Sequence, residues 1–117
     1  MANPNLANLT SILGTTAVQA IGTSATAIVT NSAASGTIVK VDALYISNVD
    51  GTTSYTVNVD VYRSSTAYRI AYLVTVPAGA TLDVLSKYIY LQEGDSLRLT
   101  ASSASKLEAV CSYEVIS

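Results

Sequence analysis

Carboxylates are spread along the chain, and they are the side chains with the chemistry to work as an acid and base pair. Two carboxylates at the right separation hydrolyse glycosidic bonds. The sequence contains no histidine, which excludes Ser-His-Asp and Cys-His nucleophile systems and most zinc sites. Every candidate acid falls at an outward strand position or in a turn. We therefore expect solvated or interface charge rather than a catalytic pair from Asp42, Asp60, Asp83, Glu93, Asp95, Glu108 and Glu114.

Metal and cofactor chemistry finds little support in the remaining residues. The single cysteine, Cys111, lies in an apolar run and is expected to be a small buried hydrophobe. Only one carboxylate lies near the Asp50-Gly51 turn, whereas a calcium loop needs several oxygen ligands. Gly79 and Gly94 stand alone in turns and form no phosphate-binding loop. We expect a chain that is not an enzyme, with no catalytic residue, no metal and no cofactor.

The eight tyrosines are the other side chains with binding chemistry. Tyr45, Tyr55, Tyr68 and Tyr72 share the phase of valine and isoleucine neighbours, which predicts core packing. Tyr62, Tyr88 and Tyr90 fall on the opposite phase. Exposed tyrosines mark contact surfaces, because they supply rigid amphipathic area. These three are the candidate partner-binding aromatics, and they are also the candidates for sugar stacking in a carbohydrate-binding module.

The composition favours contact with other proteins. Apolar residues make up 50% of the chain and charged residues only 12%, with a net charge of −2. Soluble domains carry about twice that share of charge, so the polar surface here is built from serine and threonine hydroxyls. The few cations form no stripe, which argues against nucleic acid and anionic membranes as partners. No apolar run approaches the ~20 residues of a membrane-spanning helix.

The elements that would position these side chains are predicted to be short β-strands. Runs of β-branched and aromatic residues alternate with turns rich in Gly, Ser, Asn and Asp, and no stretch shows a helical period. This pattern predicts an all-β, two-sheet antiparallel sandwich with an immunoglobulin-like or jelly-roll topology. The expected strands span 15–21, 25–30, 37–48, 55–62, 68–76, 81–85, 87–91, 96–101 and 106–116.

Alternation within the strands assigns faces. In strand 37–48, Val39, Val41, Ala43 and Tyr45 fall on one face. Asp50-Gly51 after this strand predicts a tight hairpin. In the last strand two alternatives stay open: either Leu107, Ala109, Cys111 and Tyr113 face inward, or Val110 and its neighbours do.

Residues 1–13 show no clear period and are expected to form an extended N-terminal arm, followed by a sandwich domain at 14–117. The arm is too apolar for a free tail, so it is expected to pack on a partner through Leu6, Leu9, Ile12 and Leu13. Residues 1–5 lack the basic and apolar regions of a signal peptide, so none is expected.

Several segments resemble small virion proteins of tailed phages that infect marine bacteria and cyanobacteria. They are MANPN at 1–5, SNVDGT at 47–52, YRIAY through VPA at 68–78, YLQEGDSL at 90–97 and VCSYEVIS at 110–117. These motifs are turns and strand ends, and together they extend over most of the chain. Such proteins are similar to capsid decoration, or cement, proteins, and related domains occur in necks, tails and fibres.

The resemblance implies a structural virion protein, made in the host cytoplasm, that binds the outer capsid surface and stabilises the shell. Its implied partners are the major capsid protein and copies of itself, as a homotrimer. A neck, tail or fibre-base protein is the first alternative and a carbohydrate-binding module the second. The resemblance carries no catalytic residues.

Overall fold

The computed structural model of the chain describes residues 4–117. The described residues fold into β-strands joined by turns, and they contain no helix long and apolar enough to cross a membrane. The all-β prediction is confirmed. The strands are β1 (Ile12–Ala20), β2 (Thr26–Thr30), β3 (Ile38–Asn48), β4 (Tyr55–Arg63), β5 (Thr66–Val76), β6 (Thr81–Asp83), β7 (Ile89–Leu91), β8 (Ser96–Ala101) and β9 (Leu107–Ile116).

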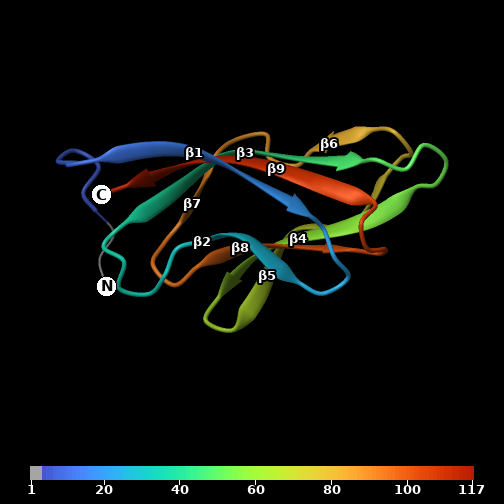
Figure 1. Cartoon of the computed structure of the whole chain (residues 1–117). Coiled ribbons are helices and arrows are strands. Elements are labelled where there is room, and N and C mark those ends of the chain that lie inside the picture. The colour runs from blue at the N-terminus through green and yellow to red at the C-terminus, as the bar shows by residue number, and fades with distance from the viewer. Residues whose placement is uncertain (1–3) are drawn as a thin grey trace.

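Two antiparallel sheets pack face to face, as Figure 1 shows. Sheet A has the order β1-β9-β3-β6, with β7 also paired to β3, and sheet B has the order β2-β8-β4-β5. Strands β6 and β7 pair with different parts of the same edge of β3, so they act as one interrupted strand. Counted in this way, the order is that of a jelly roll, which decides between the two predicted topologies.

The core lies between the sheets and is filled by inward aliphatic side chains. In β9, Leu107, Ala109 and Cys111 are at most 1% exposed, whereas Val110 is 42% exposed. This settles the alternatives left open for the last strand in favour of the Leu107 phase. The largest fully buried side chains elsewhere are Ile21, Leu44, Ile46, Leu91, Leu97 and Leu99.

The face assignment of β3 is correct for its first half and wrong for its second. The register against β9 shifts between Val41 and Ala43, so Asp42 is an extra residue in a β-bulge. An inserted residue moves every following side chain to the other face. Leu44 is therefore fully buried, while Tyr45 is 43% exposed on the outer face.

The predicted hairpin at Asp50-Gly51 is also wrong, because this turn joins β3 in sheet A to β4 in sheet B. The Asp50 carboxylate accepts hydrogen bonds from the backbone N–H and the hydroxyl of Thr52, at 2.8 and 2.9 Å. These bonds hold a side-chain turn that needs no left-handed backbone at Gly51. The tight hairpin is instead β4–β5, where Ser64 and Ser65 both have positive φ.

The prediction that four tyrosines pack in the core is correct in part for Tyr55 alone, which is half-buried. Tyr45, Tyr68 and Tyr72 are 43%, 58% and 60% exposed. The bulge in β3 turns Tyr45 outward. The register of β5 against β4 shifts twice, which breaks the simple alternation from which the phase of Tyr68 and Tyr72 was derived.

Strand β1 begins at Ile12 rather than at residue 15, so Ile12 and Leu13 belong to sheet A instead of the expected arm 1–13. Directly before the strand, the backbone of Ser11 exchanges two hydrogen bonds with Ser117, each of 2.9 Å. Thr10 also donates to the Ser117 carbonyl at 2.7 Å. The chain is therefore fixed to the sheet from Thr10 onward, and residues 1–3 of the expected arm lie outside the described part.

Candidate functional site

The outer surface of sheet A carries a row of exposed apolar side chains across three strands. Val18 of β1 lies opposite Val110 of β9, which lies opposite Tyr45 of β3. These side chains are 75%, 42% and 43% exposed. Paired residues in a sheet point to the same side, so the three form a continuous strip.

A second row beside the first contains Thr16, Ser112 and Ala43, which occupy matching positions on the same strands. We call the two rows together the sheet A face: Thr16, Val18, Ala43, Tyr45, Val110 and Ser112. Its side chains are uncharged and short apart from Tyr45. A flat surface of this kind loses little side-chain entropy and pays no charge desolvation when another protein covers it.

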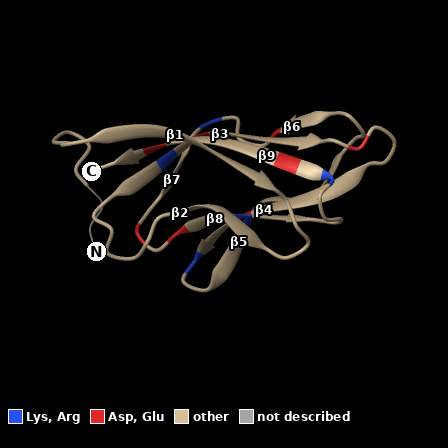
Figure 2. Cartoon of the chain, in the orientation of Figure 1, with Lys and Arg blue, Asp and Glu red and all other residues tan. Residues whose placement is uncertain are grey.

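Charge borders the sheet A face without entering it. Glu108 lies on one side of the strip, and Lys40 and Glu114 face each other on the other side, with Nζ and Oε1 3.9 Å apart. Strand β1 contains no Lys, Arg, Asp or Glu at all, and Figure 2 shows it tan along its whole length. This distribution, with an apolar centre and a polar rim, is that of protein interaction surfaces.

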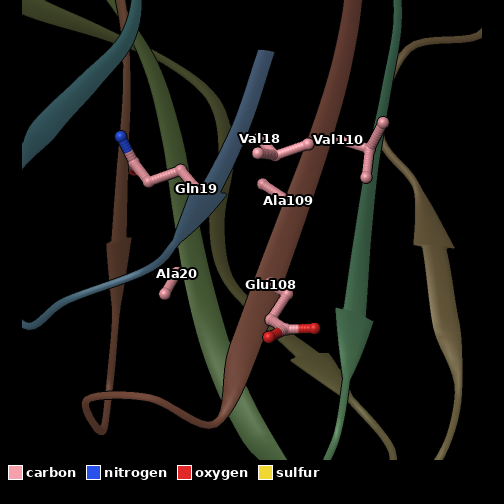
Figure 3. A pocket seen from close by; sticks show the side chains of 6 residues that line it. All are labelled: Val18, Gln19, Ala20, Glu108, Ala109 and Val110. Carbon is pink, nitrogen blue, oxygen red and sulfur yellow. The ribbon is translucent and has the colours of Figure 1, made fainter. Parts of the chain in front are cut away.

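A shallow cavity of about 270 Å³ opens at the β1 end of this face (Figure 3). Val18 and Val110 lie side by side on neighbouring strands, and the Glu108 carboxylate lies at the border of the cavity. The other lining residues are Gln19, Ala20 and Ala109. An apolar hollow of this size accepts one or two side chains from a partner rather than a complete small-molecule ligand.

Gln19 fixes the position of β1 over the other sheet. Its amide Nε2 donates to the backbone carbonyl of Ala27 in β2 at 3.0 Å. This bond ties the edge strand of sheet A to the edge strand of sheet B. Strand β1 is thus paired with β9 along one edge and tied to β2 of the other sheet by one side-chain hydrogen bond.

Two of the three candidate contact tyrosines, Tyr88 and Tyr90, lie next to each other. Their rings meet edge to face with centroids 5.4 Å apart, and the Lys40 Nζ lies 4.4 Å from the centroid of Tyr88. Tyr88 is 52% exposed. The ammonium occupies one face of the Tyr88 ring, which leaves less of the free ring surface that sugar stacking requires.

Tyr62 lies on the other sheet, away from this pair. Its ring is covered by the Arg98 guanidinium, with the carbon 3.8 Å from the ring centroid. Arg98 in turn donates from Nε to Oδ1 of Asp60 at 3.0 Å. The structure therefore does not gather the three predicted contact tyrosines into one patch.

A second cavity, of about 350 Å³, lies where the edge of sheet B approaches β7 of sheet A. Tyr68 and Ile70 of β5 form one side of it, and Ile89 and Tyr90 form the other. The remaining lining residues are Val61 and Arg63. Sequence reasoning assigned Tyr68 to the core, and the structure places it instead at this opening between the sheets.

The buried acids belong to structural ion pairs. Asp60 is 1% exposed and lies 3.7 Å from the guanidinium of Arg69 in addition to its bond with Arg98. Asp95, also 1% exposed, receives a 2.8 Å hydrogen bond from Nε of Arg63. Within residues 4–117, no three His, Cys, Asp or Glu side chains come close enough together to hold a metal ion.

Two of the acids have pKa values below the ordinary aspartate value. Burial by itself would raise the pKa of Asp95, but the hydrogen bonds from Arg63 and from the backbone N–H of Gln92 outweigh it and lower the pKa. Hydrogen bonds from Thr52 lower the pKa of Asp50. Both carboxylates are held in the charged form, which suits structural anchors rather than general acids.

The predicted arm residues lie apart from one another. Leu6 is 47% exposed, while Leu9 is half-buried. A turn precedes Leu9, because the side chain of Asn5 accepts from the backbone N–H of Ala7 at 3.0 Å. Ile12 and Leu13 are 56% and 63% exposed. Ile12 shares the phase of Val18 and continues the apolar surface along β1, whereas Leu13 points to the opposite side of the strand.

Sequence reasoning missed Val18 and left Val110 undecided. A signal for Val110 was present, because it shares its strand phase with Glu108, Ser112 and Glu114, which mark the outer face. No such signal existed for Tyr45, since the bulge that turns it outward is formed by an ordinary aspartate.

Comparison with known proteins gives a fold and no family. No protein-family model matches the chain, and no curated protein matches it. Its structure is similar to a solved chain of the Bacillus endospore appendages, which are described as a novel family of disulfide-linked pili. The TM-score is 0.52 and the identity 13%, and the match covers 90% of this chain and 85% of the other. At this identity the similarity shows a shared fold.

Proposed function

We propose that this chain is a structural subunit of a protein assembly and that the sheet A face is its contact surface. The observation that carries the proposal is the aligned strip Val18, Val110 and Tyr45. Exposed apolar side chains are ordinary when scattered, but a contiguous strip with a polar rim marks an interaction site. The half-open cavity beside Val18 would receive a side chain of the partner.

The assembly we propose is the tailed-phage virion, with the chain as a capsid decoration protein on the major capsid protein. The support is the resemblance of its turns and strand ends to small virion proteins. The jelly roll adds an argument by analogy, because this fold also occurs in viral capsid domains. A neck, tail or fibre-base position uses the same surface and stays the alternative within the virion.

The test is binding to emptied capsids, lacking this chain, from the tailed phage that carries its gene. The double variant Val18→Ser with Val110→Ser should weaken binding at least ~10-fold, which corresponds to about 1.4 kcal/mol. Val49→Ser is the matched control, because Val49 is 54% exposed in the turn after β3 and lies outside the sheet A face. Equal binding by both variants would overturn the contact surface, and no binding by the full chain would overturn the capsid assignment.

The arm is tested separately by removing residues 1–9. This truncation keeps Thr10 and Ser11 and hence their hydrogen bonds to Ser117, so sheet A should remain folded. Loss of capsid binding with a retained thermal transition would assign attachment to the arm. Binding at full strength would leave the sheet A face as the attachment surface and remove the arm from it.

A filament subunit is a second candidate, favoured by the structural similarity to a chain from bacterial pili. It differs from the first in needing no foreign shell. Electron microscopy of the purified chain at high concentration discriminates the two, since filaments formed by the chain alone would support this second assignment.

A further inference from the structure

We propose that two copies of this chain pair edge to edge through β1, antiparallel and about a two-fold axis at Thr16. The inference deepens the proposed function by naming a partner, a second copy, and it rests on that function in taking the chain to be an assembly subunit. It departs from the homotrimer that the resemblance implies, because pairing about a two-fold axis gives a dimer. Strand β1 forms one border of sheet A, next to β9 (Figure 1), and no described strand pairs with its other side.

Strand β1 differs from the other edge strands in lacking every usual protection. Exposed strand edges are normally blunted by shortness, bulges, charge or proline. Strands β6 and β7 have three residues each, β2 has a register shift, and β5 has two register shifts and a charged Arg69. β1 has nine residues in unbroken register with β9 and contains neither charge nor proline.

The free hydrogen-bonding groups of β1 follow from its pairing with β9. The backbones of Ser11 and Ile21, at the two ends of the strand, both bond to the β9 side. In an antiparallel pair, successive residues direct their N–H and C=O groups to opposite sides. The even-numbered residues therefore direct theirs to the free edge, and all of them are exposed: Ile12, Gly14, Thr16, Val18 and Ala20.

These free groups are complementary to themselves. In an antiparallel pair centred on Thr16, that residue meets its own copy, Gly14 meets Val18, and Ile12 meets Ala20. Each pair joins two residues whose backbones point across the edge, so the hydrogen-bond phase is satisfied throughout. The pairing also sets a large side chain against a small one in both outer positions, and the space above Gly14 is open for the valine.

The absence of charge fits a self-pair in particular. Like charges directly opposite each other destabilise a sheet, and a residue on a two-fold axis always meets its own charge. An uncharged strand avoids this penalty. Edge pairing with a second copy would extend sheet A in the order β9-β1-β1-β9 and join two sheet A faces into one surface.

Cysteine trapping tests the register. Cα atoms of directly hydrogen-bonded antiparallel residues lie ~5.5 Å apart, within disulfide range. Thr16→Cys should thus form a disulfide-linked dimer under mild oxidation. Val18→Cys is the matched control, because residue 18 of the second copy would be displaced by four residues along the strand, ~13 Å away. The native Cys111 is fully buried and does not interfere. Equal trapping of both variants, or of neither, would overturn the proposal.

A charge exchange gives an independent test by sedimentation. The wild-type chain should show twice its monomer mass of 12.1 kDa. Thr16→Lys and Thr16→Asp should each weaken the dimer at least ~10-fold, and their mixture should restore it. Thr75→Lys, at an exposed threonine of β5, should dimerise normally. A monomer at all concentrations, a trimeric mass, or no recovery on mixing would contradict edge pairing through β1.

The two proposals fail separately. A chain that dimerises but does not bind capsids would contradict the proposed function and leave edge pairing in place. A chain that binds capsids as a monomer would contradict edge pairing and leave the proposed function in place.

Discussion

Val18 of β1 lies directly opposite Val110 of β9, and both side chains point away from the core of the sandwich. Neither packs inside the monomer, so their apolar character adds little to folding. Replacing both with serine should change the free energy of unfolding by less than about 1 kcal/mol, the range of strand propensity at exposed sites. Urea unfolding measures this, and a loss above about 2 kcal/mol would show that the pair packs inside.

The bulge at Asp42 predicts opposite results at neighbouring positions. Leu44→Ala should destabilise the chain by about 2–5 kcal/mol, because Leu44 is fully buried and its truncation leaves a cavity. Tyr45→Ala should cost less than about 1 kcal/mol, because Tyr45 is 43% exposed on the outer face. Denaturant midpoints of the two variants compare them, and the reverse order would place the bulge elsewhere.

Breaking the pair of Arg63 and Asp95 should destabilise the chain strongly. Arg63→Met leaves the buried Asp95 carboxylate without its charged donor, at a cost of about 3 kcal/mol. Arg63→Met combined with Asp95→Asn should recover part of this loss, since no buried charge then remains unpaired. A double variant that is no more stable than Arg63→Met alone would contradict the assigned pairing.

The Asp95 carboxylate also makes the stability of the folded chain depend on pH. The pKa of Asp95 is lowered in the folded chain, so the unfolded chain binds the proton more readily at low pH. The stability from Asp95 is thus complete above the ordinary aspartate pKa of about 4 and is lost as pH falls through the lower folded value. Urea midpoints at pH 7 and pH 3 measure it. Asp95→Asn should reduce this pH dependence, and an unchanged dependence would assign it to Asp50 instead.

The thiol of Cys111 should be inert in the folded chain. Burial and the neighbouring charge of Asp42 raise its pKa to about 11, and its side chain is fully buried. A thiol reagent should label it at the rate of unfolding, whereas the exposed cysteine of Val18→Cys should react at once. Labelling of both thiols at similar rates would show that β9 opens locally.

Particular elements show where sequence reasoning sufficed. The alternation in 55–62 predicts a strand with one buried face, and the burial of Val57 and Val59 confirms it. The pattern of the last strand left two phases open, and only the structure selected the phase of Leu107. Period-two patterns report burial directly wherever a strand is regular. The burial of Cys111, which its apolar run predicts, is also confirmed.

The candidate surface could not be predicted in the same way. Tyr45 faces outward because of a one-residue bulge, and no residue type in the sequence predicts a bulge of this kind. The pairing of Val18 with Val110 and Tyr45 joins residues from distant parts of the chain, which depends on strand order.

The amino-acid sequence by itself determined that this chain forms a β-sandwich, because alternating side chains specify one buried side for each strand. It also determined the scarcity of charge on the surface. The tertiary structure alone decided that β1 is an unprotected edge and that three strands align their apolar side chains. Edges and cross-strand rows are properties of strand order and register, which arise from long-range pairing and are not encoded in any local pattern.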